Sequence, residues 1–149
     1  MIGLLQRVRH AQVEIGAERV AAIGAGMLVL VGVQQDDTEA TAERLLERLL
    51  GYRVFPDANG KMNLNIKQAG GELLLVPQFT LAADTRSGMR PGFSTAASPA
   101  MGQHLYSYLL AQAQLQPLPV ASGQFGEDMQ VSLMNDGPVT FWLEVNPRH

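Results

Sequence analysis

Two short segments of this 149-residue chain carry groups that suit chemistry on a carbonyl. The first is Pro77-Gln78-Phe79-Thr80-Leu81, in which an apolar run ends in an amide and a hydroxyl just before a long loop. Backbone N–H groups and the Thr80 hydroxyl at such a strand end can face a substrate carbonyl and stabilise the oxyanion that develops on it. The simpler interpretation is an ordinary strand end with Phe79 in the core, and composition alone favours it.

The second segment is Asn135-Asp136-Gly137-Pro138-Val139-Thr140. Asp-Gly is a frequent hairpin turn, so the segment is first interpreted as a turn between two strands. A Gly–Pro bond at a turn can also be cis, although only about 5–6% of X–Pro bonds in folded proteins are. A cis bond would hold two consecutive carbonyl groups as a rigid pair of hydrogen-bond acceptors.

Missing residue patterns narrow the chemistry further. The chain has no cysteine, which excludes disulfides, thiolate catalysis, zinc fingers and iron–sulfur clusters. Its three histidines, His10, His104 and His149, are not at metal-ligand spacing, and the P-loop, GxGxxG and GxSxG patterns are absent. We therefore expect no metal and no cofactor. A Ser–His–Asp triad stays open, because the order of its members varies between folds.

Hydropathy and turn residues predict the strands that position these two segments. Residues 27–33 form an unbroken apolar run, typical of a strand buried on both faces. A strand over residues 72–81 is interrupted by Pro77, which has no ladder donor and must lie at an edge, a bulge or a strand end. Further strands are predicted over residues 2–8, 11–15, 18–23, 129–134 and 139–145, and a turn at residues 57–60 lies between residues 53–55 and 63–66.

Two helices are predicted from caps and apolar spacing. The first begins after Asp36, with Glu39 placed for a capping box. Its buried stripe consists of Ala42, Leu45, Leu46, Leu49 and Leu50. The second begins at Ser98-Pro99 and follows a long, aperiodic loop over residues 82–97, a length that often carries function. Two helices among about seven strands indicate an α+β fold, a single domain over residues 1–149 with a mostly antiparallel, barrel-like sheet.

The net charge limits the kinds of macromolecule that the chain is expected to bind. The chain holds 11 Lys+Arg and 14 Asp+Glu, and a net charge of −3 argues against a protein that grips many phosphates of DNA or RNA. Charged residues make up only 17% of the chain, against roughly 25% in typical soluble domains, which is consistent with a surface covered by a second copy. No apolar run approaches the ~20 residues of a membrane span, so we expect a cytoplasmic protein. The basic residues of the middle third are Arg53, Lys61, Lys67, Arg86 and Arg90.

Taken together, the two segments and their neighbours resemble the D-aminoacyl-tRNA deacylase family, the bacterial and eukaryotic type with a Gly-cisPro motif. The resemblance runs from residue 1 to about residue 145. It rests on the stretches MIGLLQRV, LGYRVFPDANGKMNLN, QFTLAADTRSGMRP and DMQVSLMNDGPVTFWLEV. Two positions depart from the family pattern, because Pro77 and Gly92 stand where the family usually has serine. Pro77 thereby removes a backbone N–H and a hydroxyl beside the first segment.

The resemblance implies a homodimer that proofreads translation by hydrolysing the ester between a D-amino acid, or mischarged glycine, and the terminal adenosine of tRNA. Gln78, Phe79 and Thr80 would line the pocket for that adenosine and the ester, with catalysis from backbone donors and positioning. Gly137 and Pro138 would reach in from the other subunit. Their carbonyls would meet the α-ammonium group of the substrate and leave no room for an L side chain.

The same resemblance matches Arg7 to a family arginine that supports the Gly-Pro motif from behind. It leads us to predict a cis Gly137–Pro138 bond. We predict that Thr80 positions the substrate rather than attacking it, because a nucleophilic threonine needs an adjacent base and the sequence offers no obvious one. An aminoacyl ester is already activated by its α-ammonium group, and the ribose 2′-hydroxyl can assist hydrolysis. Positioning and backbone donors can therefore supply much of the catalysis.

Two other interpretations remain open. One is a conventional hydrolase of small esters that uses Ser87 or Thr80 as its nucleophile. The other is a protein that binds the RNA end and has lost activity through Pro77. Hydrolysis of free D-amino-acid esters as fast as of charged tRNA would indicate the first, and tight tRNA binding without turnover would indicate the second.

Overall fold

The computed structural model describes residues 1–147, so His149 lies outside the described residues. The strands of its main sheet are β1 (Ile2–Ile15), β2 (Glu18–Ile23), β3 (Gly26–Gly32), β6 (Glu72–Pro77), β7 (Val120–Ser122) and β8 (Gln130–Glu144). The other elements are α1 (Glu39–Gly51), the hairpin of β4 (Phe55–Pro56) and β5 (Met62–Leu64), the 3₁₀ turn η1 (Phe79–Ala82) and α2 (Pro99–Gln114). Across residues 1–147, no helix is both long enough and apolar enough to cross a membrane.

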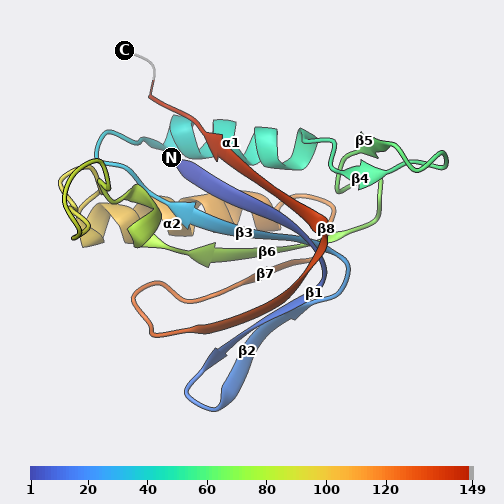
Figure 1. The fold of residues 1–149 in the computed structure, drawn as a ribbon, viewed down its shortest axis with the longest axis horizontal. Coiled ribbons are helices and arrows are strands. Elements are labelled where there is room, and N and C mark those ends of the chain that lie inside the picture. The colour runs from blue at the N-terminus through green and yellow to red at the C-terminus, as the bar shows by residue number, and fades with distance from the viewer. Residues whose placement is uncertain (148–149) are drawn as a thin grey trace.

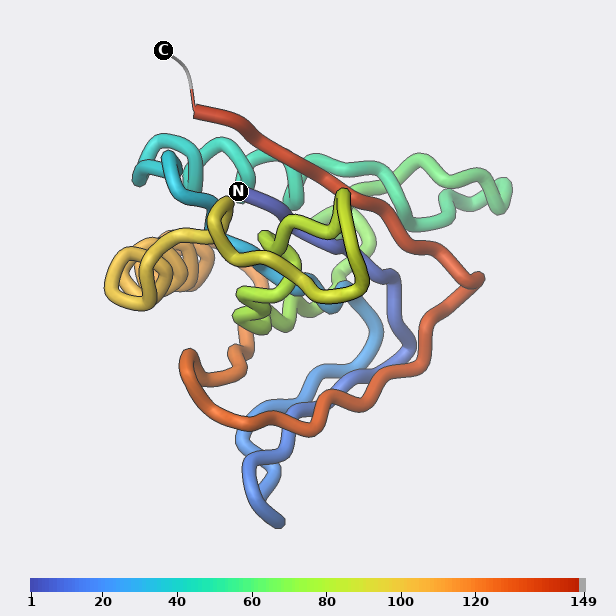
Figure 2. The backbone as a smooth tube through the Cα atoms, turned by 60° about the vertical axis from the view of Figure 1, so that its left-hand side comes forward, coloured from blue at the N-terminus to red at the C-terminus, as the bar shows by residue number. Residues whose placement is uncertain are grey.

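Strand β1 organises the main sheet. Its first half pairs antiparallel with β3, its second half with β2, and nearly its whole length with β8, which runs beside it in Figure 2. Strands β3, β6 and β7 continue the sheet in parallel, and the sheet curls into a nearly closed, barrel-like form (Figure 1). The predicted α+β class with two helices and a barrel-like sheet is confirmed.

The sheet is mostly antiparallel, as predicted, because all three pairings of β1 are antiparallel, but it also contains parallel pairs. The pairings β3–β6 and β6–β7 are both parallel. Each follows from a crossover: α1 and the β4–β5 hairpin connect β3 to β6, and η1 with α2 connects β6 to β7. A parallel neighbour needs such a long connection, whereas a tight turn gives only an antiparallel one.

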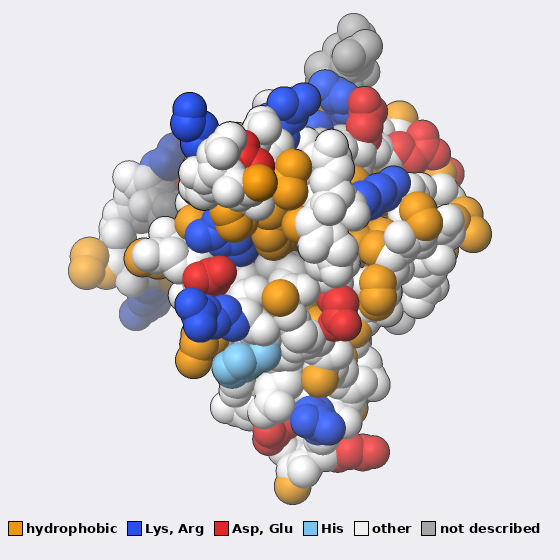
Figure 3. Space-filling view, turned by 90° about the vertical axis from the view of Figure 1, so that its right-hand side faces the viewer, with side chains coloured by type: hydrophobic (Ala, Val, Ile, Leu, Met, Phe, Trp, Pro, Cys, Tyr) orange, Lys and Arg blue, Asp and Glu red, His pale blue; other side chains and the backbone are white. Residues whose placement is uncertain are grey.

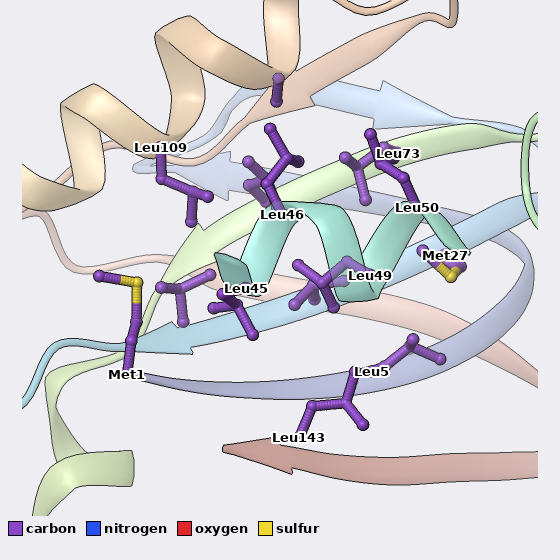
Figure 4. Close-up of a cluster of buried hydrophobic side chains, with 14 of the residues drawn as sticks. Met1, Leu5, Met27, Leu45, Leu46, Leu49, Leu50, Leu73, Leu109 and Leu143 are labelled. Atoms are coloured by element: carbon purple, nitrogen blue, oxygen red, sulfur yellow. The ribbon is translucent and has the colours of Figure 1, made fainter. Parts of the chain in front are cut away.

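Two apolar layers lie on the two faces of the sheet. Alternate residues of β3 and β6, such as Met27 and Leu73, face the helices and join the leucine stripe of α1 and Leu109 of α2 (Figure 4). The residues between them, such as Leu28 and Leu74, fill the inside of the curled sheet. Both strands are therefore covered on both faces, as the unbroken apolar run of residues 27–33 predicts.

Helix α1 starts two residues later than predicted. Its N-cap is Thr38, whose hydroxyl accepts from the backbone N–H of Thr41, so Asp36 is not the cap. The neighbouring Asp37 is buried and engaged elsewhere: its Oδ1 accepts from the Met1 ammonium group at 2.8 Å. That ammonium group also donates to the carbonyl of Val145 at 2.6 Å, which ties the start of α1 to the ends of β1 and β8.

Two predicted pairs of strands are each a single strand. Residues 2–8 and 11–15 are both in β1, and residues 129–134 and 139–145 largely coincide with β8. The proposed hairpin turn at Asp136-Gly137 is therefore wrong. Instead β8 bulges: it makes five residue steps from Asn135 to Thr140 while β1 makes two, from Val8 to Gln6. The backbone around Gly137–Pro138 is thus pushed out of the ladder.

Candidate active site

The segment that follows β6 turns sharply at the end of the sheet. Strand β6 ends at Pro77, as expected for a proline, and not at Leu81 as the apolar run indicated. The backbone N–H of Gln78 still donates to the carbonyl of Val31 at 2.8 Å, and the chain then enters η1. Within residues 1–147, the N–H groups of Phe79 and Thr80 have no hydrogen-bond partner, because they open this turn. Two adjacent backbone donors are therefore free for a ligand.

A cavity of about 450 Å³ lies beside this turn. Pro77, Gln78 and Phe79 line one part of it, and the chain after β7 supplies Phe125 and Met129. The start of α2 closes a further side, with Ser98, Pro99 and Gly102. The lining is mainly apolar, with Glu127 and Asp128 at its polar part. Its size and its flat aromatic and proline surfaces suit a nucleoside.

Thr80 does not line that cavity, contrary to the prediction that it lines the adenosine pocket with Gln78 and Phe79, and lies instead at a second, more open depression. Its neighbours there include Asp84, Arg86 and Trp142. The Thr80 hydroxyl is in contact with the side-chain amide of Gln78, and this amide is not a base. Hydroxyl attack needs an adjacent base, so the geometry around Thr80 fits positioning better than nucleophilic attack. Ser87 lies exposed in the loop after η1 with no histidine or carboxylate bonded to it among the described residues.

Arg86 and Asp84 form an exposed ion pair beside Thr80. The Arg86 Nη2 atom lies 2.8 Å from Asp84 Oδ2, and its Nε lies 2.9 Å from Oδ1. Hydrogen bonds from the Arg86 guanidinium and backbone lower the pKa of Asp84 to about 2. Asp84 is consequently an anion at any physiological pH, and its low pKa makes it a weak general base.

The Gly137–Pro138 peptide bond is cis, as predicted. Both residues are exposed on the bulge of β8. Asn135 braces the bulge from within, because its Oδ1 accepts from the N–H of Val139 at 2.8 Å and its Nδ2 donates to Thr140 Oγ1 at 2.7 Å. Gly137 has φ of +140°, and an added Cβ would lie 2.6 Å from Val139 Cγ2. Only glycine fits this position without a rearrangement.

Arg7 lies directly behind the bulge. Its Nε donates to the carbonyl of Asp136 at 3.0 Å, and its Nη1 donates to the carbonyl of Val54 at 2.6 Å. A terminal nitrogen of Arg7 would also meet a Cβ on Gly137 at 3.3 Å. Arg7 thus connects the backbone that precedes the Gly137–Pro138 bond to the chain between α1 and β4.

The two predicted halves of the site are not brought together within one chain. Turn η1 packs on Gly32, which pairs with Ile2 at the start of β1. The Gly137–Pro138 bulge instead lies between Gln6 and Val8. Four to six strand residues separate these positions, about 13–20 Å at the usual rise. One chain therefore presents a cavity with free donors at one place and a projecting pair of carbonyls at another.

Comparisons with known proteins agree on one family. A model of the family described as D-Tyr-tRNA(Tyr) deacylase matches residues 4–144. A protein of Pseudomonas savastanoi pv. phaseolicola named D-aminoacyl-tRNA deacylase is 64% identical over 144 residues, covering 97% of this chain and 99% of its own. A protein of the same name from Pseudomonas putida (strain W619) is 65% identical over 145 residues, covering 97% and 100%.

The chain belongs to the D-aminoacyl-tRNA deacylase family. It is accordingly a hydrolase of this family. Among solved structures, "c-Myc DNA Unwinding Element Binding Protein" is similar with a TM-score of 0.94 and 36% identity, covering 99% of this chain and all of that chain. A structure described as a probable eukaryotic D-amino acid tRNA deacylase has a TM-score of 0.81 at 16% identity over 95% of this chain, which shows the shared deacylase fold.

Three residues of this candidate site are absent from the sequence-based prediction. Phe125 and Met129 line the cavity, and Asn135 braces the bulge. The signal for Phe125 was an aromatic residue between Gly123 and Gly126 in a stretch without secondary-structure periodicity. The order of residues alone gives no sign that this stretch returns to the end of β6.

Proposed function

We propose that this protein hydrolyses the ester bond between a D-amino acid and the terminal adenosine of tRNA, and that it also hydrolyses mischarged glycyl-tRNA, in the cytoplasm. The observation that carries the proposal is a nucleoside-sized cavity lined by Gln78 and Phe79, at the turn where the N–H groups of Phe79 and Thr80 are free. Membership of the deacylase family and relatives named D-aminoacyl-tRNA deacylase support it.

In the proposed reaction the terminal adenosine occupies the cavity beside Gln78 and Phe79. The ester carbonyl points at the N–H groups of Phe79 and Thr80, which stabilise the negative charge that develops when water attacks the carbonyl carbon. The new carbon–oxygen bond forms, the bond to the ribose oxygen breaks, and that oxygen takes up a proton. The neighbouring 2′-hydroxyl of the substrate is well placed to pass this proton. No metal is needed, since the aminoacyl ester is activated by its own α-ammonium group.

In this proposal the Gly137–Pro138 pair of a second copy of the chain discriminates between D- and L-aminoacyl substrates. The pair projects from β8 but lies about 13–20 Å from η1 along β1, so it cannot serve the cavity of its own chain. In a two-fold dimer each chain would offer its carbonyls to the other cavity. The carbonyls would accept from the α-ammonium group and occupy the space of an L side chain. Glycine has no side chain and would not be rejected.

Strand β8 offers the face for that dimer. Trp142 is 52% exposed and Met134 is 49% exposed, and they lie on β8 on either side of the bulge that carries Pro138. Large apolar side chains on one exposed strand favour a protein–protein contact. Phe79, which is 59% exposed and lines the cavity, would be contacted by substrate. The low charge content of the chain agrees with such a buried face.

A role in binding DNA duplexes is a second interpretation, which the name of one similar solved structure raises. The charges of this chain do not favour it. On the face shown in Figure 3, basic and acidic side chains are interspersed. Binding along a duplex requires many phosphate contacts, whereas the proposed reaction needs only the 3′ end of a tRNA.

The direct test is a deacylation assay with D-tyrosyl-, L-tyrosyl- and glycyl-tRNA side by side. We expect rapid hydrolysis of the D and glycyl forms and little of the L form. Equal hydrolysis of the D and L forms would contradict the proposal. A free D-tyrosine ester is tested as a second substrate, and a DNA duplex as a competitor. Turnover of the free ester as fast as that of D-tyrosyl-tRNA would favour a small-ester hydrolase. Tight binding of tRNA without its hydrolysis would favour a binding protein.

A further inference from the structure

Strands β6 and β7 part at the edge of the proposed nucleoside cavity. They pair in parallel up to Leu75 and Ser122. Beyond this fork, β6 leads through Pro77 into Gln78, and β7 leads through Gly123 toward the cavity residues Phe125 and Met129. Hydrogen bonds at the fork therefore decide where two parts of the cavity lining stand relative to each other.

One hydrogen bond expected in the β6–β7 ladder cannot form between backbone groups. In a parallel pair the bonds recur every second residue: the N–H of Leu73 donates to Pro119, and the N–H of Gly123 donates to Leu75, both at 2.9 Å. At this register the next bond would run from the N–H of residue 77 to the carbonyl of Gly123. Residue 77 is proline and has no N–H, so the buried Gly123 lacks its ladder donor.

A side chain takes the place of that missing donor. The Ser122 hydroxyl donates to the carbonyl of Gly123 at 2.5 Å. The hydroxyl of Tyr106, which reaches the fork from α2, lies 2.6 Å from Ser122 Oγ and 2.9 Å from the carbonyl of Leu75. The Tyr106 hydroxyl has one proton, which it can donate to the carbonyl of Leu75 or to Ser122 Oγ. Because Leu75 already accepts from Gly123, donation to Ser122, with Ser122 donating to Gly123, leaves neither of these carbonyls without a donor. Burial raises the pKa of Tyr106 to about 12, which keeps this donor protonated.

The fork is packed too tightly for the carbonyl to move freely. A Cβ on Gly123 would lie 2.8 Å from Met129 Sδ and 3.4 Å from Pro77 Cδ. A shift of the Gly123 peptide would therefore move two residues that line the cavity, Pro77 and Met129. Movement of Pro77 would in turn displace the next residue, Gln78, whose side chain contacts Thr80.

We propose that Ser122 and Tyr106 are positioning residues for the deacylase site. The Ser122 hydroxyl supplies the Gly123 carbonyl with the hydrogen bond that Pro77 cannot, and Tyr106 orients that hydroxyl. Together they hold Gln78 and Phe79 at the right distance from Met129 for the terminal nucleoside. This inference rests on the proposed function for its substrate, but the coupling between Ser122 and Pro77 is measurable without any substrate.

The test is a double-mutant cycle on wild type, Ser122→Ala, Pro77→Ala and the Pro77→Ala/Ser122→Ala variant. Pro77→Ala restores a backbone N–H without adding a hydroxyl. In the wild-type background, we expect Ser122→Ala to lower Tm and to raise KM for D-tyrosyl-tRNA about threefold to tenfold, the effect of one hydrogen bond, with kcat nearly unchanged. In the Pro77→Ala background, the same change should have little effect on either quantity, because the backbone then satisfies Gly123.

Three further variants separate the hydrogen bonds from Tyr106 through Ser122 to Gly123 from the general stability of α2. Tyr106→Phe removes the outer hydroxyl and should raise KM in the same direction as Ser122→Ala. Tyr108→Phe removes a hydroxyl of the same helix that contacts Glu43 instead, and should leave KM unchanged. Ser122→Thr keeps a hydroxyl and should restore KM toward the wild-type value.

Three results would overturn the inference in distinguishable ways. Equal effects of Ser122→Ala in both backgrounds would show that Ser122 does not replace the donor lost at Pro77. Coupling in Tm with no change in KM would show a purely structural bond and remove the positioning role. A wild-type protein that deacylates no tRNA would refute the proposed function, and the positioning role with it, whatever the cycle in Tm shows.

Discussion

The Nε atom of Arg7 on β1 lies 3.0 Å from the carbonyl oxygen of Asp136 on β8, at the root of the projecting Gly137–Pro138 pair. The same guanidinium donates to the carbonyl of Val54 at 2.6 Å, so one planar group is bonded to two separate backbone segments. Arg9 also approaches Asp136, but its contact is 3.6 Å and its side chain is 71% exposed. The two arginines therefore form a natural pair of test and control.

Arg7→Lys should weaken chiral discrimination more than it weakens the fold. A lysine ammonium cannot make both backbone contacts, because it lacks the two-pronged geometry of the guanidinium. We expect the ratio of kcat/KM for D-tyrosyl- over L-tyrosyl-tRNA to fall about tenfold, the effect of losing one charged hydrogen bond. Arg9→Met should leave the ratio unchanged. A lowered Tm with an intact ratio would show that Arg7 serves only stability.

Thr80→Ala should leave a working enzyme. The proposed oxyanion donors are backbone N–H groups, which this substitution keeps, and within residues 1–147 the hydroxyl is hydrogen-bonded only to the Gln78 amide. We expect kcat to fall by about tenfold or less, as for one neutral hydrogen bond. Mass spectrometry of the wild-type protein during turnover should detect no acylated threonine. Abolished turnover together with a trapped acyl-enzyme would establish Thr80 as a nucleophile.

The sequence predicts those features of the fold and the site that depend on residues close together in the chain. The Ser98-Pro99 start of α2, the α1 leucine stripe and the end of β6 at Pro77 are set by neighbouring residues, and the structure agrees with them. The N-cap of α1 was not predicted correctly. Asp37 is bonded to the Met1 ammonium group, and Thr38 is the N-cap. That contact joins residues 36 positions apart, beyond any local pattern.

The hairpin predicted at Asp136-Gly137 failed for a similar reason. Turn propensity is local, but the continuous pairing of β8 with β1 decides the path of the backbone. The expelled residues then become a bulge that Asn135 and Arg7 stabilise. The cis bond itself was predicted only through the family resemblance. The convergence of Phe125 on Pro77 likewise depends on the parallel β6–β7 pairing, which needs a crossover that sequence spacing does not reveal.

Stability should decline at high pH through Tyr106. Burial raises its pKa from 10.0 to about 12, so the folded chain holds this proton more tightly than the unfolded chain. The stabilisation is complete below pH 10 and is lost as the pH rises toward 12. Urea unfolding between pH 8 and 11.5 should show a loss of up to about 2 kcal/mol. Tyr106→Phe should flatten this decline, and an unchanged slope in that variant would contradict the assignment.

Binding to tRNA should depend only weakly on salt. The basic residues Arg53, Lys61 and Lys67 are exposed but scattered, and Arg86 is paired with Asp84. Contacts with two or three phosphates near a single-stranded end give a slope of about −2 in a plot of log K against log salt. Titrations of a non-hydrolysable aminoacyl-tRNA between 50 and 300 mM salt, roughly the range where such slopes are linear, would measure it. A slope several times steeper would indicate an extended basic surface.

The central claim is that each working site combines η1 of one chain with Gly137–Pro138 of another. Gln78→Trp would fill the cavity mouth, and Gly137→Ala would place a methyl group 2.6 Å from Val139 Cγ2. Each variant alone should be nearly inactive on D-tyrosyl-tRNA. After subunit exchange at equal amounts, half of the dimers are mixed and each mixed dimer holds one intact site, so about a quarter of wild-type activity should return. If exchange is complete by native mass spectrometry and activity stays at the level of the separate variants, the two halves do not come from different chains.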